Sequence, residues 1–412
     1  MRYARQALVL MSVLVILSAV AACSSNSTSN SSASTTNSVK IMMIDDESDP
    51  SATEFAFPIN ADAAQATAKY INANGGISGR KIDLIVCDSQ ADPNETTDCA
   101  RQAVQDDVAA VVGSYALNSN LIPPILQAAK IPYMPSYPTG ATEYTSPISF
   151  PTAAGATVLS AMGYIAGAVC KKPTLLSEQQ PATAFNEKVV ASAVKSQGKK
   201  LVNAIAVPAN TTDYAPIAAE AMQGGADCLI VYGAQTMAGG LYPALKAAGS
   251  TQRIIGLNGQ TAGSPLDAKY PQTLNNAITT DFFPPYSSPV WNGYKQAVAK
   301  YGDPQKYDYD NSAPQLVYVS MIVFENLVKS IPAGTPVTST SVLAALHKAS
   351  NVTTNGLTAP FNFTKTFPVT GFPQTFNLSA TYGLVKDGQV VPLPGYTGFI
   401  NVSKAFAASQ GS

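Results

Sequence analysis

The feature that most constrains the fold is a repeated alternation of short, continuous apolar runs with longer helix-like stretches. The apolar runs are uninterrupted rather than alternating, which is typical of strands in a parallel sheet buried on both faces. After a restart near residue 150 the same pattern repeats. The sequence therefore predicts an α/β chain with two doubly wound parallel-sheet lobes. The predicted strands are 39–45, 81–88, 109–114, 131–136, 174–178, 200–207, 227–233 and 253–258.

The N-terminus predicts export. Arg2 and Arg5 precede an apolar run at 7–22, which is short for a membrane span and fits a cleaved signal segment. The small residues before Cys23 resemble a bacterial lipobox, which implies cleavage after residue 22, a lipid on Cys23 and anchoring to the outer face of the cell membrane. An ordinary signal peptide with an incidental cysteine is the alternative. The Ser/Thr/Asn-rich stretch 23–38 is expected to be a flexible tether.

Export permits disulfides, and four cysteines remain beside Cys23. Four cysteines allow three pairings. Cys87 ends a predicted strand and Cys99 opens the next predicted helix, so this pair is preferred, which leaves Cys170 for Cys228. A zinc site is disfavoured because the chain has no CxxC pair with a nearby histidine.

Composition excludes several classes of function. The 412 residues carry a formal net charge of −1, which gives no basic footprint for nucleic acid. The single histidine, His347, excludes multi-histidine metal sites and makes a Ser-His-Asp triad improbable. No nucleotide, phosphate-loop or metalloprotease motif is present, so no cofactor is expected. The acidic run 45–49 lacks the glycine and terminal glutamate of an EF-hand, which favours a solvated loop.

One stretch carries a family resemblance. The segment INANGGISGRKIDLIVCDSQADP resembles type I periplasmic binding proteins, in particular the leucine/isoleucine/valine-binding branch that serves ABC transporters. Weaker similarity extends through 174–180, 224–233 and 312–327. The resemblance implies a monomer of two lobes joined by three hinge crossings that close on a small ligand. It places lobe one at 39–153 plus 285–358, and lobe two at 154–284 plus 359–412.

The resemblance also implies ligand contacts in lobe one. In open parallel sheets, ligands bind beyond the carboxyl ends of the strands. By analogy with amino-acid binders, Ser114, followed by Tyr115, is expected to hold the ligand carboxylate. The loop after the fourth predicted strand, with Tyr137, Thr139 and Gly140, is expected to complete that subsite. The alternative is that Ser114 and Thr139 only cap turns.

Lobe two departs from the family pattern. Pro181 follows Gln180 where amino-acid binders often have a tyrosine, and Asn258 stands where they place an acid for the ligand ammonium. A buried ammonium without a counter-charge is costly. Either Asp281 or Glu178 therefore supplies the charge, or the ligand has no α-amino group.

Further polar and aromatic residues complete the predicted site. Phe55 or Phe57, in the first loop, is expected to cover the ligand, although either could belong to the core. Gln235, Thr236 and Gln260 lie in loops after strands and could hydrogen-bond a neutral or anionic ligand, or could equally be solvated.

These observations predict a lipid-anchored solute-binding protein. It would trap an amino acid-like molecule, or a small carboxylate or amide, and deliver it to an ABC permease without covalent chemistry. A ligand-sensing receptor component with the same fold is the alternative. A hydrolase that uses a serine and His347 is a third reading, disfavoured because the sequence has no nucleophile elbow.

Overall fold

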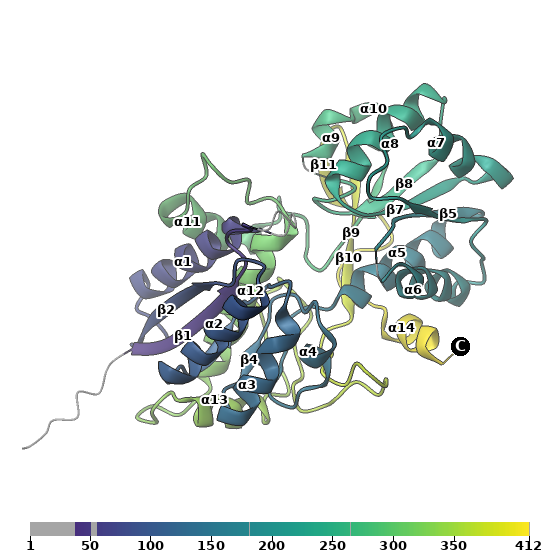
Figure 1. The fold of residues 1–412 in the computed structure, drawn as a ribbon. Coiled ribbons are helices and arrows are strands. Elements are labelled where there is room, and N and C mark those ends of the chain that lie inside the picture. Colours follow the sequence, from purple (N-terminus) through teal and green to yellow (C-terminus); the bar gives the residue numbers. More distant parts are fainter. Residues whose placement is uncertain (1–37, 51–55, 181, 264, 412) are drawn as a thin grey trace, which may run out of the picture. The chain divides into compact units, whose positions relative to one another are not determined.

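A computed structural model describes residues 38–50, 56–180, 182–263 and 265–411 (Figure 1). Its strands form two separate sheets flanked by helices, which confirms the predicted α/β class. Among the described residues, no helix combines the length and the apolarity needed to cross a bilayer. Cys23 and Phe55, which the sequence singles out, lie outside the described residues.

The first sheet is fully parallel, with the strand order β2-β1-β3-β4. Strand β1 is apolar almost throughout because side chains from its two faces enter different clusters. Ile41 packs with the cluster around Trp291, whereas Met42 packs with the cluster around Leu126. The strands are β1 Ser38–Asp45, β2 Lys81–Asp88, β3 Ala110–Val112 and β4 Tyr133–Met134.

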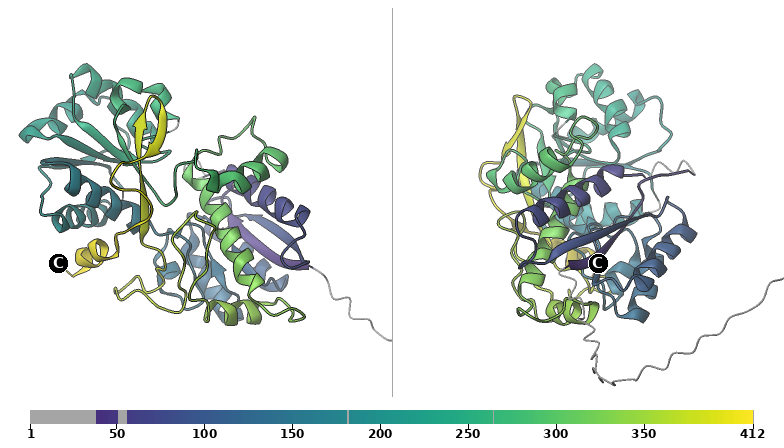
Figure 2. Two further views of the ribbon diagram at one scale, coloured as in Figure 1. Left: turned by 180° about the vertical axis from the view of Figure 1, so that it is seen from behind. Right: turned by 90° about the vertical axis from the view of Figure 1, so that its left-hand side faces the viewer.

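Helices cover both faces of this sheet. Helices α1 and α12 pack against each other on the Ile41 face (Figure 2), and α2 and α3 cover the Met42 face. Phe361 and Phe363, in the irregular segment after α13, join the Trp291 cluster. The helical elements are α1 Pro58–Ala73, α2 Pro93–Gln105, η1 Ser119–Leu121, α3 Ile122–Ala129, α4 Ala141–Thr145, η3 Pro289–Trp291, α11 Asn292–Tyr301, α12 Ser312–Lys329 and α13 Ser339–Leu346.

Local sequence signals set the helix ends near the candidate site. Asp92 caps α2, because its carboxylate accepts from the backbone N–H groups of Asn94 at 2.7 Å and Glu95 at 3.1 Å. After α1, Gly76 adopts a φ of +67°, and a Cβ there would lie 2.2 Å from the Arg80 carbonyl oxygen. This turn therefore requires glycine, which also ends the helix.

The second sheet has eight strands, of which β6, β5, β7, β8 and β9 run parallel. The C-terminal segment returns to this sheet as β10, which pairs antiparallel with β9 and β11. The sheet is thus mixed at one edge, a detail that the prediction of purely parallel lobes did not include. The strands are β5 Pro173–Glu178, β6 Ala204–Val207, β7 Cys228–Tyr232, β8 Arg253–Leu257, β9 Ile278–Asp281, β10 Ser379–Lys386, β11 Gln389–Pro392 and β12 Ile400–Asn401.

Helices again divide between the two faces. Leu175 packs with α5 and α6, whereas Leu176 on the opposite face packs with α7 and α8. The helical elements are α5 Gly155–Val169, α6 Thr183–Ser196, α7 Ala215–Ala221, η2 Gln223–Gly225, α8 Gln235–Ala247, α9 Leu266–Lys269, α10 Pro271–Leu274 and α14 Ser403–Gln410.

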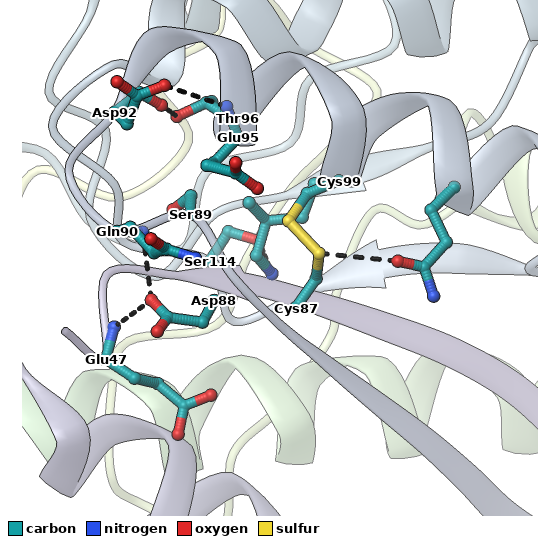
Figure 3. Close-up of a disulfide and its surroundings, with 12 residues drawn as sticks. Glu47, Cys87, Asp88, Ser89, Gln90, Asp92, Glu95, Thr96, Cys99 and Ser114 are labelled. Atoms are coloured by element: carbon teal, nitrogen blue, oxygen red, sulfur yellow. Dashed lines mark hydrogen bonds between the residues drawn. A yellow bond between two sulfur atoms is a disulfide. The ribbon is translucent and has the colours of Figure 1, made fainter.

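Both predicted disulfides are confirmed. Cys87 on β2 bonds to Cys99 on α2, with the Cα atoms 5.7 Å apart (Figure 3). Cys170, directly after α5, bonds to Cys228 at the start of β7, with the Cα atoms 6.1 Å apart. Each bridge therefore ties a helix or its end to a strand of the sheet that it covers.

Candidate functional site

Aromatic side chains form a continuous row beside the carboxyl ends of the first sheet. Phe57 stacks on Tyr115 with ring centroids 4.9 Å apart, and Tyr115 meets Tyr137 edge-on at 5.6 Å. Tyr137 in turn contacts Phe282, which directly follows β9, at 6.1 Å. Burial raises the pKa of Tyr137, and the neighbouring Tyr232, the last residue of β7, adds to that increase. Loops from both sheets thus contribute to one aromatic group.

Ser114 directly precedes Tyr115 and is fully buried. Its hydroxyl accepts a hydrogen bond from the backbone N–H of Ile44 at 3.0 Å. Its carbonyl oxygen accepts from the N–H of Ser136 at 3.0 Å. Ser114 therefore joins three segments at the carboxyl edge of the first sheet, and its contact with a ligand carboxylate stays a prediction.

Glu143 organises the loop that contains the other predicted carboxylate ligands. Its Oε2 accepts from the backbone N–H of Thr139 at 2.7 Å and of Gly140 at 2.9 Å. Its Oε1 accepts from the hydroxyl of Tyr133 at 2.8 Å. The Thr139 hydroxyl bonds to the carbonyl of Ala116 at 2.8 Å. Burial raises the pKa of Glu143 to about 6, an increase that these donors moderate.

The acidic loop after β1 is not the solvated loop that the sequence predicts. Asp45 and Asp46 are fully buried. Asp46 accepts from the hydroxyl of Ser89, from Ala91 N–H at 2.9 Å and from Leu117 N–H at 2.7 Å. These buried donors hold the loop against the sheet, which a count of charged residues could not reveal.

The carboxyl group of Asp45 accepts fewer hydrogen bonds than that of Asp46. Its Oδ1 accepts from the Asn60 amide across 3.4 Å, whereas its Oδ2 and the Asn60 Oδ1 are buried and meet no donor among the described residues. Burial raises the pKa of Asp45 well above its ordinary value, and the neighbouring carboxylates add to that increase.

In the second sheet, Asn258 and Asp281 come together. The Asn258 amide donates to Asp281 Oδ2 at 2.8 Å, and the backbone N–H of Phe282 donates to Oδ1 at 2.6 Å. The hydroxyl of Ser312, the first residue of α12, lies 3.4 Å from Asp281 Oδ1. Burial raises the pKa of Asp281 to about 7.

The remaining predicted residues are more exposed. Gln180, Gln235, Thr236 and Gln260 are all exposed. Gln235 begins α8, and its amide donates to the carbonyl of Gly259 at 2.5 Å. The structure therefore brings Gln235 towards the loop after β8 and leaves Gln180 in the loop after β5.

Sequence reasoning missed Tyr232 and Glu143. Tyr232 ends the strand DCLIVYG, and the rule that ligands bind beyond the carboxyl ends of strands could have selected it. Glu143 is the third residue of α4, and its acceptance from the Gly140 N–H has the spacing of a capping box, a local signal that could have selected it.

One cluster of metal-ligating residue types lies away from this site. Within the described residues, Cys170, Asp227 and Cys228 approach one another closely. Both sulfur atoms belong to the disulfide, and Asp227 accepts from the N–H groups of Lys171 and Lys172, each at 2.8 Å. The cluster is therefore a disulfide with a neighbouring turn rather than a metal centre.

Comparisons with known proteins agree with this architecture. The sequence profile of the periplasmic binding protein family matches residues 38–373. A search of curated protein sequences found no relative.

Solved structures share the fold at low sequence identity. An ABC transporter substrate-binding protein from Sphaerobacter thermophilus has a TM-score of 0.71 at 16% identity, with 88% of this chain and 98% of that chain covered. A solute-binding protein from R. palustris in complex with 4-hydroxybenzoate has a TM-score of 0.66 at 16% identity, covering 88% and 97%. A branched-chain amino acid binding protein from Streptococcus pneumoniae in complex with isoleucine has a TM-score of 0.65 at 18% identity, covering 88% and 99%.

The family profile spans most of the chain, and both sheets have the expected helical layers. The protein therefore belongs to the periplasmic binding protein family, whose members bind small ligands and catalyse no reaction.

Proposed function

We propose that this protein is a lipid-anchored solute-binding protein of an ABC transporter. It captures a small molecule outside the cytoplasm and delivers it to a permease in the same membrane. The observation that carries the proposal is the family match over residues 38–373. The proximity of Tyr137 to Tyr232 and its ring contact with Phe282 support it, because loops beyond the strands of both sheets meet there.

The ligand in this proposal is amino acid-like, or a small carboxylate or amide, and it binds beside the aromatic row. The relatives in complex with 4-hydroxybenzoate and isoleucine are consistent with a small organic solute. Binding is assigned to the loops that carry Phe57, Tyr115, Tyr137, Asn258 and Asp281. The lobe boundaries at 153/154, 284/285 and 358/359 belong to the same proposal. The third boundary is too early for the core packing, because Phe361 and Phe363 belong to the Trp291 cluster of the first sheet.

A thermal-shift experiment tests solute binding. A ligand that binds only the folded state stabilises it by about 2.7 kcal/mol at a concentration one hundred times its Kd. We expect at least one compound from a panel of amino acids, small carboxylates, amides, amines and aromatic acids to raise the Tm. A flat response across the whole panel would contradict the proposal.

A separate experiment tests the anchor. The proposal predicts that the mature chain begins at Cys23, carries acyl groups and partitions with membranes. Intact-mass measurement detects the acyl groups. A Cys23→Ala variant should lose both the added mass and the membrane association. Membrane association of that variant at the parental level would contradict lipid anchoring without affecting the thermal-shift result.

A further inference from the structure

The backbone donors that could hold a ligand carboxylate in the first sheet are already engaged. Thr139 N–H and Gly140 N–H both donate to Glu143 Oε2, at 2.7 and 2.9 Å. The Thr139 hydroxyl donates to Ala116 at 2.8 Å. Glu143 is fully buried, and its carboxylate accepts the hydrogen bonds that these groups could otherwise donate to a ligand. We call this carboxylate the internal anion. A ligand carboxylate at this loop would have to compete with it.

Ser114 is engaged in the same way. Its hydroxyl accepts from Ile44 N–H at 3.0 Å and lies near the hydroxyl of Tyr133, which donates to Glu143 Oε1 at 2.8 Å. Because Ser114 is fully buried, its hydroxyl is not presented to a solute in this structure.

The loops beyond the strands also lack positive charge. The sequence has no lysine, arginine or histidine in the seven segments that follow β1, β3, β4, β5, β7, β8 and β9, whereas these segments contain several acidic residues. A buried carboxylate needs a cationic or hydrogen-bonding partner to offset its desolvation. The segments are 45–57, 114–120, 136–145, 178–186, 232–245, 258–266 and 281–294.

Acceptors, by contrast, remain near the aromatic row. Asp45 forms a β-bridge with Tyr115 but is itself fully buried, so its carboxyl group is not presented to a solute. Glu47 and Glu178 are partly exposed. Glu178 Oε2 accepts from Ala234 N–H at 2.8 Å, which leaves its second oxygen as an available acceptor. These two glutamates complement a solute that donates hydrogen bonds.

We infer that the solute is an organic amine or amide without a carboxylate, with its N–H groups directed at acidic side chains beside the aromatic row. This inference rests on the proposed solute-binding function and narrows its ligand class. An ammonium or amide group near Phe57, Tyr115 or Tyr137 would also gain from contact with ring faces.

Two matched compound series test the inference by thermal shift. One consists of 4-hydroxybenzoate, 4-hydroxybenzamide and 4-hydroxybenzylamine, and the other of L-leucine, L-leucinamide and 3-methylbutylamine. We expect an amide or amine to raise the Tm at concentrations where its carboxylate partner leaves it unchanged. A carboxylate that raises the Tm as much as its partners overturns the inference and leaves solute binding intact. If no compound of either series or of the broader panel raises the Tm, the proposed function is overturned instead.

A Glu143→Ala variant tests the internal anion directly, with acetate as the probe. Removing the carboxylate leaves the N–H groups of Thr139 and Gly140 without their acceptor, so we expect a lower Tm that excess acetate partly restores. Acetate should not raise the Tm of the parent or of a Glu187→Ala control. A Glu143→Ala protein with the parental Tm, or an equal acetate effect on the control, would overturn this step.

A second variant keeps the test possible if Glu143→Ala does not fold. Glu143→Gln keeps the side-chain shape but presents one carbonyl oxygen in place of the carboxylate. We expect it to lower the Tm clearly more than Glu187→Gln does. Equal Tm values for these two amide variants would overturn the role of Glu143 as the internal anion.

Discussion

The side-chain amide of Asn258 donates to the carboxylate of Asp281 across 2.8 Å, and the two residues lie at the ends of neighbouring strands β8 and β9. The acid therefore stands one strand away from the place where the family resemblance expects it. Ser312 at the start of α12 also approaches Asp281, at 3.4 Å. Asp281 thus connects the second sheet to a helix that packs on the first.

Replacing Asp281 should change how stability depends on pH. Its folded pKa of about 7 lies above the ordinary 3.8, so the folded state favours the protonated acid. This contribution is complete below about pH 4 and is lost as the pH rises towards 7, with a magnitude on the order of 3 kcal/mol. Urea unfolding at pH 4.5 and 7.5 should therefore show a smaller loss of stability in Asp281→Asn than in the parent.

Glu143 contributes in the same direction, because its folded pKa of about 6 also exceeds the ordinary 4.5. The pH dependence of Asp281→Asn is therefore reduced rather than abolished. The exposed Asp98→Asn variant is the matched control and should retain the parental dependence. Equal slopes for Asp281→Asn and the parent would refute the assignment.

Removal of each disulfide should destabilise the protein, and the longer loop should matter more. The Cys87–Cys99 bridge spans 12 residues and the Cys170–Cys228 bridge spans 58. Chain-entropy arguments assign about 3 kcal/mol to the first and about 4 kcal/mol to the second. Urea unfolding of the two double-alanine variants measures both values, and a larger loss for the shorter loop would contradict this ordering.

The neighbouring phenols of Tyr137 and Tyr232 should show energetic coupling. A hydrogen bond between their hydroxyls would contribute about 1 kcal/mol net. A double-mutant cycle with Tyr137→Phe and Tyr232→Phe should therefore give a coupling of about that size. Tyr396→Phe, combined with Tyr137→Phe, is the control and should be additive. Additivity of the Tyr137 and Tyr232 changes would remove the basis for joining the two loops.

The cap of α2 offers a local test. Asp92 accepts two backbone hydrogen bonds, at 2.7 and 3.1 Å. Replacing it with alanine should cost about 1 kcal/mol, whereas asparagine at the same position should retain most of the stability. Chemical denaturation of Asp92→Ala and Asp92→Asn measures the difference. Equal losses of stability in the two variants would show that the loss does not come from the hydrogen bonds of the Asp92 cap.

Much of the fold could be predicted because its signals are local. The continuous apolar runs correspond to strands β1, β2, β5, β7 and β8, and the Cys87–Cys99 bridge follows from a strand end next to a helix start. The antiparallel return of β10 beside β9 could not be predicted, because it pairs Thr381 with Asp281 across a long stretch of chain.

The candidate site was less predictable for a related reason. Loop position and the family resemblance marked Ser114, Thr139 and Asn258, and the structure places each near the carboxyl end of a strand. Their hydrogen-bond partners come from elsewhere in the chain: Ile44 for Ser114 and Asp281 for Asn258. The spacing of residues along the sequence does not show which distant residues bond to them. It therefore cannot distinguish a donor that is available to a ligand from one that is already hydrogen-bonded.

The sequence by itself predicted most strands and helices in their order and the preferred cysteine pairs, because periodicity and segment composition act over short distances. Only the tertiary structure decided which polar groups are buried and what they bond to. Asp46 and Glu143 both look like surface acids in the sequence, yet both are fully enclosed by donors. Burial depends on which distant segments meet, and that meeting sets the charge and hydrogen-bonding capacity of the site.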